Sequence, residues 1–450
     1  MSFKQNLVNA RHHFVFLLGL TVAFGIVFKI EQKQFKEDLA TALVYSEEIP
    51  APKPRPLTAE EQRWAEIAWR YFQNNTQPTG LVNSVNNYPS TTLWDTSSYL
   101  MGLISAQRLG IITETEFSLR LSNALTSLAK LPLYDQQLPN KAYDTRSLSM
   151  VNYDNSVNKR GIGWSAIDIG RLLVPFNILA WQYPRYTEQV SRVLSRWDME
   201  PLLQRGLMYG ATIDNELNVD ETMYVQEGRI GYEEYAAKSL SLMGQDVSQA
   251  LRYTDFLVFE NIDGVDVPTD SRDPDRYKAH NYVVSESYIL DGLEFGWDRV
   301  SHEFAWRVYQ AQQARYERTG MLTSVSEDNI DRPPYFVYNT VFSDGKSWNA
   351  VTDDGTDASE FKTLSTKASF GWYALYRDKY SRLLLAEASE LFDAQKGWYS
   401  GKYEVTEEIN KALTANTNGI ILESLLYIQE GQLLNVGSNK GPVRLAQKEE

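Results

Sequence analysis

Six stretches of this chain share one arrangement of polar and apolar positions. A loop rich in Trp, Asp, Tyr and Asn leads into an apolar segment lined with small residues, and a more charged amphipathic segment often follows. Apolar positions at this spacing predict helices, and small residues let neighbouring helices approach closely. The six openings lie at 93–98, 163–168, 232–237, 284–288, 365–370 and 415–419.

The pattern predicts an all-α domain in which twelve helices, alternately inner and outer, close into an (α/α)6 toroid. Thr58 and Glu61 have the spacing of a capping box that opens the first helix. The stretch after Met243 is too short to indicate an outer helix clearly, so it is the weakest member of the twelve. Long polar loops precede the inner helices and should gather on one face. Further outer helices are expected at 114–130, 184–197, 301–319 and 379–395.

Residues 14–28 form an apolar run without charge, somewhat shorter than the roughly 20 residues of a typical spanning helix. No small-x-small cleavage site follows directly, so we expect an uncleaved anchor. Basic residues on both sides of the run leave its orientation open. The expected division is a flank at 1–13, an anchor or uncleaved signal at 14–30, a Pro-containing stalk at 31–57, the toroid at 58–431 and a solvated tail at 432–450.

Composition excludes several classes of function. A formal net charge of −14 argues against nucleic-acid binding, which needs a basic face. The chain has no Cys, which excludes disulfides, thiol catalysis and cysteine-ligated metals, and its four His residues do not indicate a metal centre. The sequence shows no G-x-S-x-G elbow, phosphate loop or H-E-x-x-H motif. We therefore expect neither a metal nor a cofactor.

Carboxylates recur where the predicted inner helices begin, at Asp95, Asp168, Glu233, Glu234 and Glu286. Any one of them can simply cap its helix, because free N–H groups stabilise a carboxylate there. Their recurrence in successive hairpins indicates more, since acids that converge on one pocket shift each other's pKa values. Glycoside hydrolysis needs such a set, with one protonated acid and one ionised carboxylate beside the scissile bond.

Aromatic and polar residues of the same loops and helix starts fit a sugar ligand. Aromatic rings stack on the apolar faces of sugars, and polar side chains hydrogen-bond to hydroxyl groups; the alternative is that about half of the rings pack under loops. The candidate substrate-binding residues are Trp94, Tyr153, Asp154, Trp164, Glu233, Glu286, Lys367 and Asn418.

Two stretches carry a family resemblance. Residues 79–82 and 92–111, with the Trp94-Asp95 pair, resemble the opening of six-hairpin glycosidase-like domains, which include the glycoamylase-like domains of β-1,2-glucanases. The chain is more similar still to an uncharacterised bacterial family beside them, in which that pair, Gly-Trp-Ser-Ala-Ile-Asp (163–168) and Asn-Thr-Asn-Gly (416–419) recur. The resemblance implies an (α/α)6 barrel and a glycan ligand.

The resemblance also implies roles for single residues. The glucanase relatives have a Tyr-x-Glu at the third inner helix, and Tyr232-Glu233-Glu234 matches it with Glu234 in the place of the general acid. Those relatives carry Asp-x-Gly at the sixth inner helix, where this chain has Thr417-Asn418-Gly419. A base therefore cannot be transferred from that position. Asp95 or Asp168 supplies it, the mechanism differs, or catalysis has been lost.

Two hypotheses of function follow. The first is a membrane-anchored periplasmic glycoside hydrolase that acts on a bacterial glucan or exopolysaccharide by carboxylate acid/base catalysis. The second is a non-catalytic glycan-binding partner of a polysaccharide synthesis or export complex. The cluster of acids favours the first, and the missing Asp favours the second. Both expect a poly- or oligosaccharide partner and attachment to the bacterial inner membrane through residues 14–30, whereas a domain facing the cytoplasm is the alternative location.

Overall fold

The computed structural model describes residues 43–213, 221–277 and 280–436. The expected flank (1–13), anchor (14–30) and the first part of the stalk lie outside the described residues, as does most of the expected tail. Among the helices that are described, none combines the length and apolar character needed to cross a bilayer. Residues from Ile49 onward form one compact unit.

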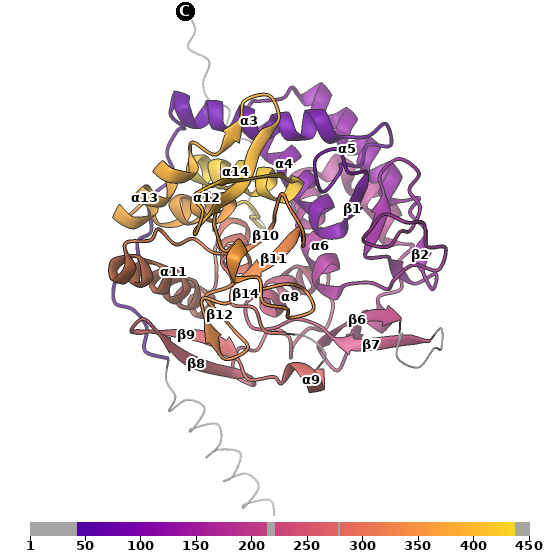
Figure 1. Ribbon diagram of the computed structural model, residues 1–450. Helices are drawn as coiled ribbons and strands as arrows, with labels where there is room; N and C mark the ends of the chain where they lie inside the picture. The colour runs from indigo at the N-terminus through magenta and orange to yellow at the C-terminus, as the bar shows by residue number, and fades with distance from the viewer. Residues whose placement is uncertain (1–42, 214–220, 278–279, 437–450) are drawn as a thin grey trace, which may run out of the picture. The chain divides into compact units, whose positions relative to one another are not determined.

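Six inner helical segments form a closed ring, as the sequence predicts (Figure 1). Each contacts the next around the ring, and the last returns to the first. The fourth is a short α-helix continued by a π-helical turn. The inner segments are α4 (Leu93–Arg108), α6 (Ala166–Gln182), α8 (Tyr232–Leu242), α10 (Glu286–Leu290) with η3 (Asp291–Phe295), α12 (Thr366–Tyr376) and α14 (Ala415–Glu430).

Small residues bring these helices together, as expected. A Cβ on Gly419 of α14 would lie 2.6 Å from the Ser98 carbonyl oxygen of α4, and one on Gly170 of α6 would lie 2.6 Å from the Ala236 Cβ of α8. Pro175 lacks the N–H that would bond to the Arg171 carbonyl oxygen. The Ser97 hydroxyl of α4 donates to that oxygen instead, at 2.8 Å. The carbonyl oxygen that Pro175 leaves without a partner in its own helix thus joins two inner helices.

In the described part of the chain, five outer α-helices surround the ring, and the capping box of Thr58 and Glu61 is present as predicted. Their inward faces pack on the inner helices; Phe72, for example, contacts Tyr99 with ring centroids 5.5 Å apart. The outer helices are α3 (Ala59–Asn75), α5 (Glu114–Leu128), α7 (Thr187–Leu194, preceded by η1, Pro184–Tyr186), α11 (Arg299–Thr319) and α13 (Lys379–Ala388).

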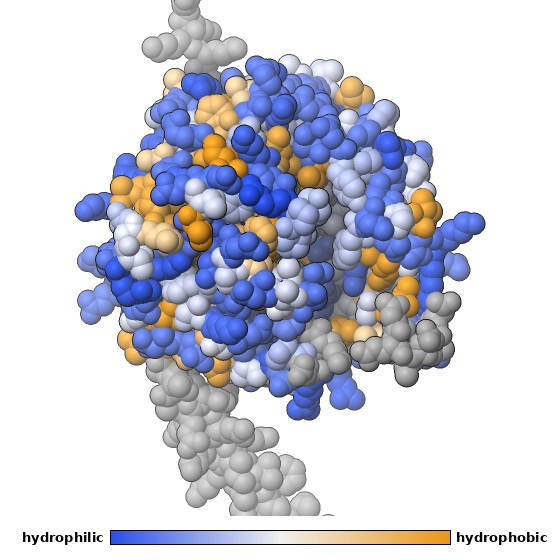
Figure 2. Space-filling view, in the orientation of Figure 1, coloured by the Kyte–Doolittle hydropathy of each residue, from blue (hydrophilic) through white to orange (hydrophobic). Residues whose placement is uncertain are grey.

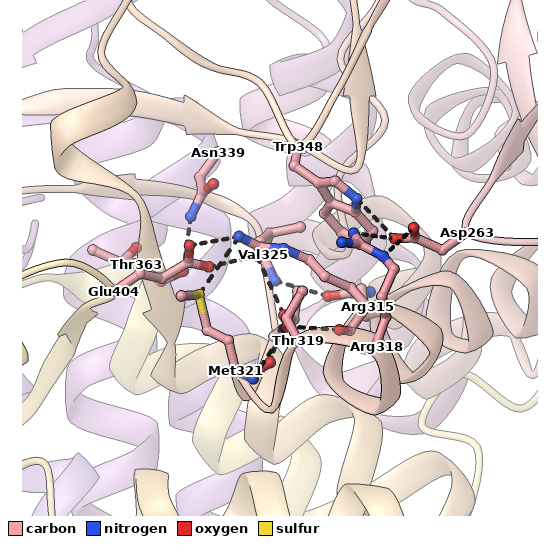
Figure 3. A network of polar contacts seen from close by, with 12 residues as sticks. Asp263, Arg315, Arg318, Thr319, Met321, Val325, Asn339, Trp348, Thr363 and Glu404 are labelled. Carbon is pink, nitrogen blue, oxygen red and sulfur yellow. Dashed lines mark hydrogen bonds and ion pairs between the residues drawn. The ribbon is translucent and has the colours of Figure 1, made fainter.

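The prediction of twelve helices is wrong at its weakest member. Residues 243–256 form turns, and the antiparallel hairpin of β8 (Leu257–Ile262) and β9 (Val265–Asp270) packs against α11 instead of an outer helix. Figure 3 shows how the hairpin turn is held: Asp263 accepts hydrogen bonds from Arg318 at 2.6 Å and from the Trp348 indole at 3.1 Å. Beside α11, a β-hairpin therefore stands in the outer layer in place of a sixth outer helix.

The loops contain β-strands, which the predicted all-α domain does not include. The described residues form seven small sheets, because the polar loops fold into antiparallel hairpins on the face where the inner helices begin or around the rim. The remaining strands are β1 (Ser90–Thr92), β2 (Leu133–Tyr134), β3 (Leu138–Pro139), β4 (Ala142–Asp144), β5 (Leu203–Gln204), β6 (Leu207–Ile213), β7 (Thr222–Gln226), β10 (Glu327–Asn329), β11 (Phe336–Asn339), β12 (Phe342–Ser343), β13 (Lys346–Ser347), β14 (Ala350–Val351), β15 (Thr363–Ser365), β16 (Phe392–Asp393), β17 (Gly397–Tyr403) and β18 (Ile409–Leu413); the short helices are η2 (Glu200–Leu202), α9 (Pro274–Tyr277) and η4 (Ser359–Phe361).

Two expected boundaries differ most from the structure. The helix expected to reach residue 395 ends at Ala388, because Phe392 and Asp393 pair with β17 as strand β16. The expected solvated tail begins too early, since Leu433 and Leu434 are buried and their N–H groups donate to carbonyl oxygens of η3.

A buried ionic layer crosses the ring below the beginnings of the inner helices. Arg171 of α6 pairs with Glu294 of η3 and, at 2.9 Å, with Glu423 of α14; all three side chains are completely buried. Tyr235 of α8 accepts a hydrogen bond from Arg171 at 2.7 Å and donates one to Glu294 at 2.7 Å. Four inner segments are therefore joined by one guanidinium.

Replacing Arg171 with Met should lower the free energy of unfolding by about 3–5 kcal/mol, because two buried carboxylates lose their counter-charge. The exposed Arg192, which pairs with Glu188 one turn away on α7, provides the control. Arg192→Met should cost less than about 1 kcal/mol. Urea unfolding measures both, and equal losses would contradict a central role for Arg171.

Candidate functional site

Glu286 joins the starts of four inner helices. Its Oε1 accepts hydrogen bonds from the Trp94 indole N–H of α4 at 2.7 Å and from Asn416 Nδ2 of α14 at 2.8 Å. Its Oε2 lies 2.5 Å from Lys367 Nζ of α12. Glu286 is 1% exposed, so its carboxylate is not free to bind a ligand. Glu286 and the three side chains that it contacts form the floor of the site.

Two adjacent acids from the loop before α12 complete this floor. Asp328 of β10 lies 3.4 Å from Lys367 Nζ, and Glu327 accepts a hydrogen bond from the Tyr232 hydroxyl of α8. Burial raises the pKa of each carboxyl to about 7, although the Lys367 charge opposes the shift. One lysine therefore faces three carboxylates, and the floor has an excess of acidic groups.

Asp95 and Asp168 occupy equivalent places on neighbouring inner helices. Thr92 caps α4 and donates from its hydroxyl to Asp95 Oδ2 at 2.9 Å, and Ser165 caps α6 and donates to Asp168 Oδ1 at 3.1 Å. In return, each aspartate N–H donates to the capping hydroxyl. Both residues keep part of their surface exposed. Thr92 and Ser165 are thus the capping residues, and each aspartate carboxylate is bound to the capping hydroxyl beside it.

The two aspartates have different electrostatic surroundings. Burial of its carboxyl and the nearby charges of Glu227 and Asp95 together raise the pKa of Asp168 to about 7, against the opposing effects of the Ser165 hydrogen bond and the Lys141 charge. Burial also raises the pKa of Asp95, but hydrogen bonds from Ser84 and Thr92 and the charge of Lys367 oppose that shift. Asp168 is thus the better proton donor near neutral pH, and Asp95 is the more easily ionised of the two.

The molecular surface is hollowed on this face. Figure 2 shows a deep recess right of the centre, where Figure 1 shows α6 near the loop of β10 and β11. Tyr153, 64% exposed, lies close enough to Asp168 for that charge to raise the pKa of its phenol beyond the effect of burial. Trp94 and Tyr232 are partly exposed, with ring centroids 5.7 Å apart. Aromatic rings thus border the aspartates.

The structure places Glu233 and Glu234 apart from this group. Tyr232 and Tyr235 of α8 both contact Trp94, so with about 3.6 residues per turn the two residues between them point elsewhere. Glu233 pairs with Arg272 at 2.7 Å. Glu234 is 3% exposed and accepts the Gly231 N–H at 2.7 Å, while burial and Glu233 raise its pKa. The assignment of Glu234 as general acid stays a prediction.

Three other candidates have mainly structural contacts. Trp164 is completely buried and donates to the Tyr209 carbonyl oxygen at 3.0 Å. Asn418 is also buried; it accepts the Trp398 N–H at 2.8 Å, and the inward amide of the sixth helix is Asn416 instead. Asp154 is exposed and closes a local turn with Ser156. Substrate contact by Trp164 or Asn418 would require rearrangement, whereas substrate binding by the exposed Asp154 stays a prediction.

Sequence reasoning missed Glu227, Glu327, Asp328 and Asn416. Glu327 and Asp328 are consecutive acids in a long loop before an inner helix, which was a usable signal. Asn416 begins the Asn-Thr-Asn-Gly motif, two residues before the candidate Asn418. Glu227 directly follows strand β7, whose pairing no local pattern predicts, so only the fold reveals its neighbour. Among the described residues, no three His, Asp or Glu side chains are arranged to hold a metal ion.

The arrangement defines an (α/α)6 toroid of the six-hairpin glycosidase-like class, and solved structures with this fold match it. An endo-β-1,2-glucanase from Chitinophaga pinensis, solved with sophorotriose and glucose, has a TM-score of 0.58 and 11% identity, covering 84% of this chain and 94% of that one. A candidate glucoamylase from Bacteroides caccae gives 0.59 and 11%, with coverage of 83% and 94%. An endo-β-1,2-glucanase from Talaromyces funiculosus with sophorose gives 0.54 and 11%, with coverage of 83% and 84%. At such identity, the likeness shows the fold.

The chain belongs to the family described as "Protein of unknown function (DUF3131)", whose model matches residues 63–431. A search of curated protein sequences found no significant match. The resemblance to six-hairpin glycosidase-like domains seen in the sequence is therefore confirmed at the level of fold.

Asp168 should make stability depend on pH. Its ordinary pKa is 3.8 and its pKa in the folded protein is about 7, so the folded protein keeps a proton that the unfolded chain loses. Its contribution to stability is therefore present at low pH and is lost as the pH rises from about 4 to 7. Asp168→Asn should raise the melting temperature at pH 8 and change it little at pH 4. A uniform shift at both pH values would contradict the raised pKa.

Proposed function

We propose that this protein is a glycoside hydrolase that acts on a bacterial glucan or exopolysaccharide by carboxylate acid/base catalysis. The observation that carries the proposal is the pair Asp95 and Asp168. The two side chains occupy equivalent positions on adjacent inner helices, and both are partly exposed. The pKa of Asp168 is raised to about 7, whereas hydrogen bonds and the Lys367 charge oppose the rise in the pKa of Asp95. Hydrolysis of a glycosidic bond requires one protonated and one ionised carboxyl group beside the scissile bond.

In the proposed reaction, protonated Asp168 donates its proton to the glycosidic oxygen as the bond to the anomeric carbon breaks. Ionised Asp95 accepts a proton from a water molecule whose oxygen attacks that carbon. One glycan and one water thus give two sugar fragments, and a proton passes through solvent from Asp95 to Asp168 to restore the starting state. Asp168 is preferred to Glu234 as the acid because Asp168 keeps exposed surface whereas Glu234 caps its own helix.

The neighbouring rings support a sugar ligand. Trp94 is held by Glu286 and by the Arg171 guanidinium, 5.7 Å from its ring centroid, so a sugar that stacks on it meets a fixed surface. Tyr232 packs beside Trp94, and the exposed Tyr153 lies near Asp168. The proposal of a glucan draws support from the glucanases that share the fold.

The second candidate function is a non-catalytic glycan-binding partner of a polysaccharide synthesis or export complex. It draws support from the sixth inner helix, which contributes the amide side chain of Asn416 to the site. An amide, unlike a carboxylate, cannot act as a general base. It also fits the way Lys367 engages Glu286 and Asp328. Under this reading the recess binds sugar but leaves every glycosidic bond intact.

We further propose that residues 14–30 anchor the protein in the bacterial inner membrane with the toroid in the periplasm. The charge-free apolar run and the absence of an adjacent cleavage site support this location. The protein should remain in the membrane fraction after alkaline carbonate extraction, and a protease added to spheroplasts should digest the toroid. A mature N-terminus after Ala42, or protection from the protease, would contradict this location.

Asp168→Asn and Asp95→Asn should each lower kcat by about 100- to 10,000-fold, because each removes a group that transfers a proton. Glycan binding, measured by calorimetry, should change little. Purified residues 49–450 and their variants are tested on linear β-glucans and bacterial exopolysaccharides, with reducing ends and product anomers as readouts.

Asp378→Asn is the matched control, because Asp378 caps the outer helix α13 and an asparagine caps equally well. Glu234→Gln should retain activity within about tenfold. If Glu234→Gln abolishes turnover while Asp168→Asn does not, the acid is Glu234. If the wild type binds a glycan and never cleaves it, the binding-partner function replaces hydrolysis.

A further inference from the structure

A third carboxylate, Glu227, reaches the start of α6 from outside that helix. It directly follows β7, and its carboxylate oxygen Oε2 accepts the backbone N–H of Ala166, the first residue of α6. Asp168 belongs to the same first turn. A single helix start therefore holds two acidic side chains, one from its own sequence and one supplied by the neighbouring hairpin.

Close backbone packing makes this approach possible. The Ala211 N–H of β6 donates to the Trp164 carbonyl oxygen at 2.9 Å, and a Cβ on Gly163 would lie 1.8 Å from the Ala211 carbonyl oxygen. A Cβ on Gly210 would lie 2.5 Å from Glu227 Oε2 itself. Gly163 also has a φ of +101°, which other residues rarely adopt. Two glycines are thus required to bring the hairpin, and with it Glu227, onto α6.

The Ser165 hydroxyl lies between the two acids. It donates to Asp168 Oδ1 at 3.1 Å, and it also interacts with the Glu227 carboxylate. The charged or titratable groups that face Asp168 come from four neighbouring segments: Asp95 of α4, Lys141 between β3 and β4, Tyr153 of the rim and Glu227 after β7. Lys141 is the cation among them and acts on Glu227 as well, together with the backbone N–H of Ala166.

We propose that Glu227 is a positioning residue for the hydrolysis proposed above: seated as an anion on the start of α6, it keeps Asp168 in the protonated form that donates to the leaving group. Burial raises the pKa of Glu227, but the Lys141 charge, the Ser165 hydroxyl and the Ala166 N–H oppose that rise and stabilise the negative charge on Glu227. Like charges at this separation disfavour ionisation of both groups together. After Asp168 has given up its proton, the repulsion from Glu227 favours its reprotonation, so Glu227 also helps to reset the site.

This proposal rests on the proposed function, and its first test does not need activity. A double-mutant cycle of Asp168→Asn and Glu227→Gln is measured by thermal unfolding at pH 4 and pH 8. Glutamine still accepts the Ala166 N–H, so the variant should fold. At pH 8, Asp168→Asn should raise the melting temperature more in the wild type than in the Glu227→Gln background. At pH 4 the two shifts should agree.

Glu61→Gln is the matched control, because Glu61 is a buried acid in the first turn of the outer helix α3. Paired with Asp168→Asn, it should give additive changes at both pH values. Absence of coupling between Asp168 and Glu227 at pH 8 would overturn the proposal whether or not the protein is an enzyme.

The second test is the pH profile of kcat/KM on a cleaved glycan. In Glu227→Gln the alkaline limb should move to lower pH by about one unit, so that activity at pH 8 relative to the optimum falls about tenfold. Glu227→Asp, which keeps the charge, should restore most of the shift. A purely structural role would instead lower activity at every pH alike.

The outcomes separate the two proposals. An active wild type whose alkaline limb is unmoved by Glu227→Gln overturns the role of Glu227 and leaves hydrolysis standing. A wild type that cleaves no glycan overturns hydrolysis, and with it the role of Glu227 in that reaction, even if the unfolding cycle shows coupling.

Discussion

The ion pairs of Arg171 are the interaction on which the centre of the toroid depends. A guanidinium without exposed surface is tolerated only when its charge is balanced, and Glu294 and Glu423 do so from two other inner helices. Each of these helices must then keep its rotation and height relative to α6. Because the Arg171 guanidinium also lies over the Trp94 ring, the same pairs fix the lower surface of the recess. Packing of small residues brings the helices together, and these charges set their register.

Above this layer, the fold sorts acids that look alike in the sequence. Asp95 and Asp168 are each held by a capping hydroxyl, yet one faces Lys367 and the other faces Glu227. Glu286 is fully engaged by its contacts with Trp94, Asn416 and Lys367, and it orients these side chains. Differences in neighbours, and not in residue type, thus divide the acids into structural members and members available for chemistry.

The inner ring and its face were predictable because both depend on local periodicity. Apolar segments that open with Thr92, Ser165 or Thr414 give capped helices, and repetition of the pattern points their starts to one place. Side-chain direction was not predictable to the same degree. Glu233 is drawn away by Arg272, a residue nearly forty positions later, and Asn418 is bonded to the backbone of β17. Glu327 and Glu227 enter from hairpins whose strand pairing no local pattern specified.

The buried ionic layer of Arg171, Glu294 and Glu423 also determines whether a polymer can pass through the ring. A toroid with an open axis would let a polymer thread from one side to the other. Here the axis is filled by completely buried side chains, and the recess is blind. Any chain bound above Trp94 must enter and leave through the same mouth, so a long polysaccharide would lie across the recess or dip one end into it, and released fragments would have to clear the mouth before the next segment could settle.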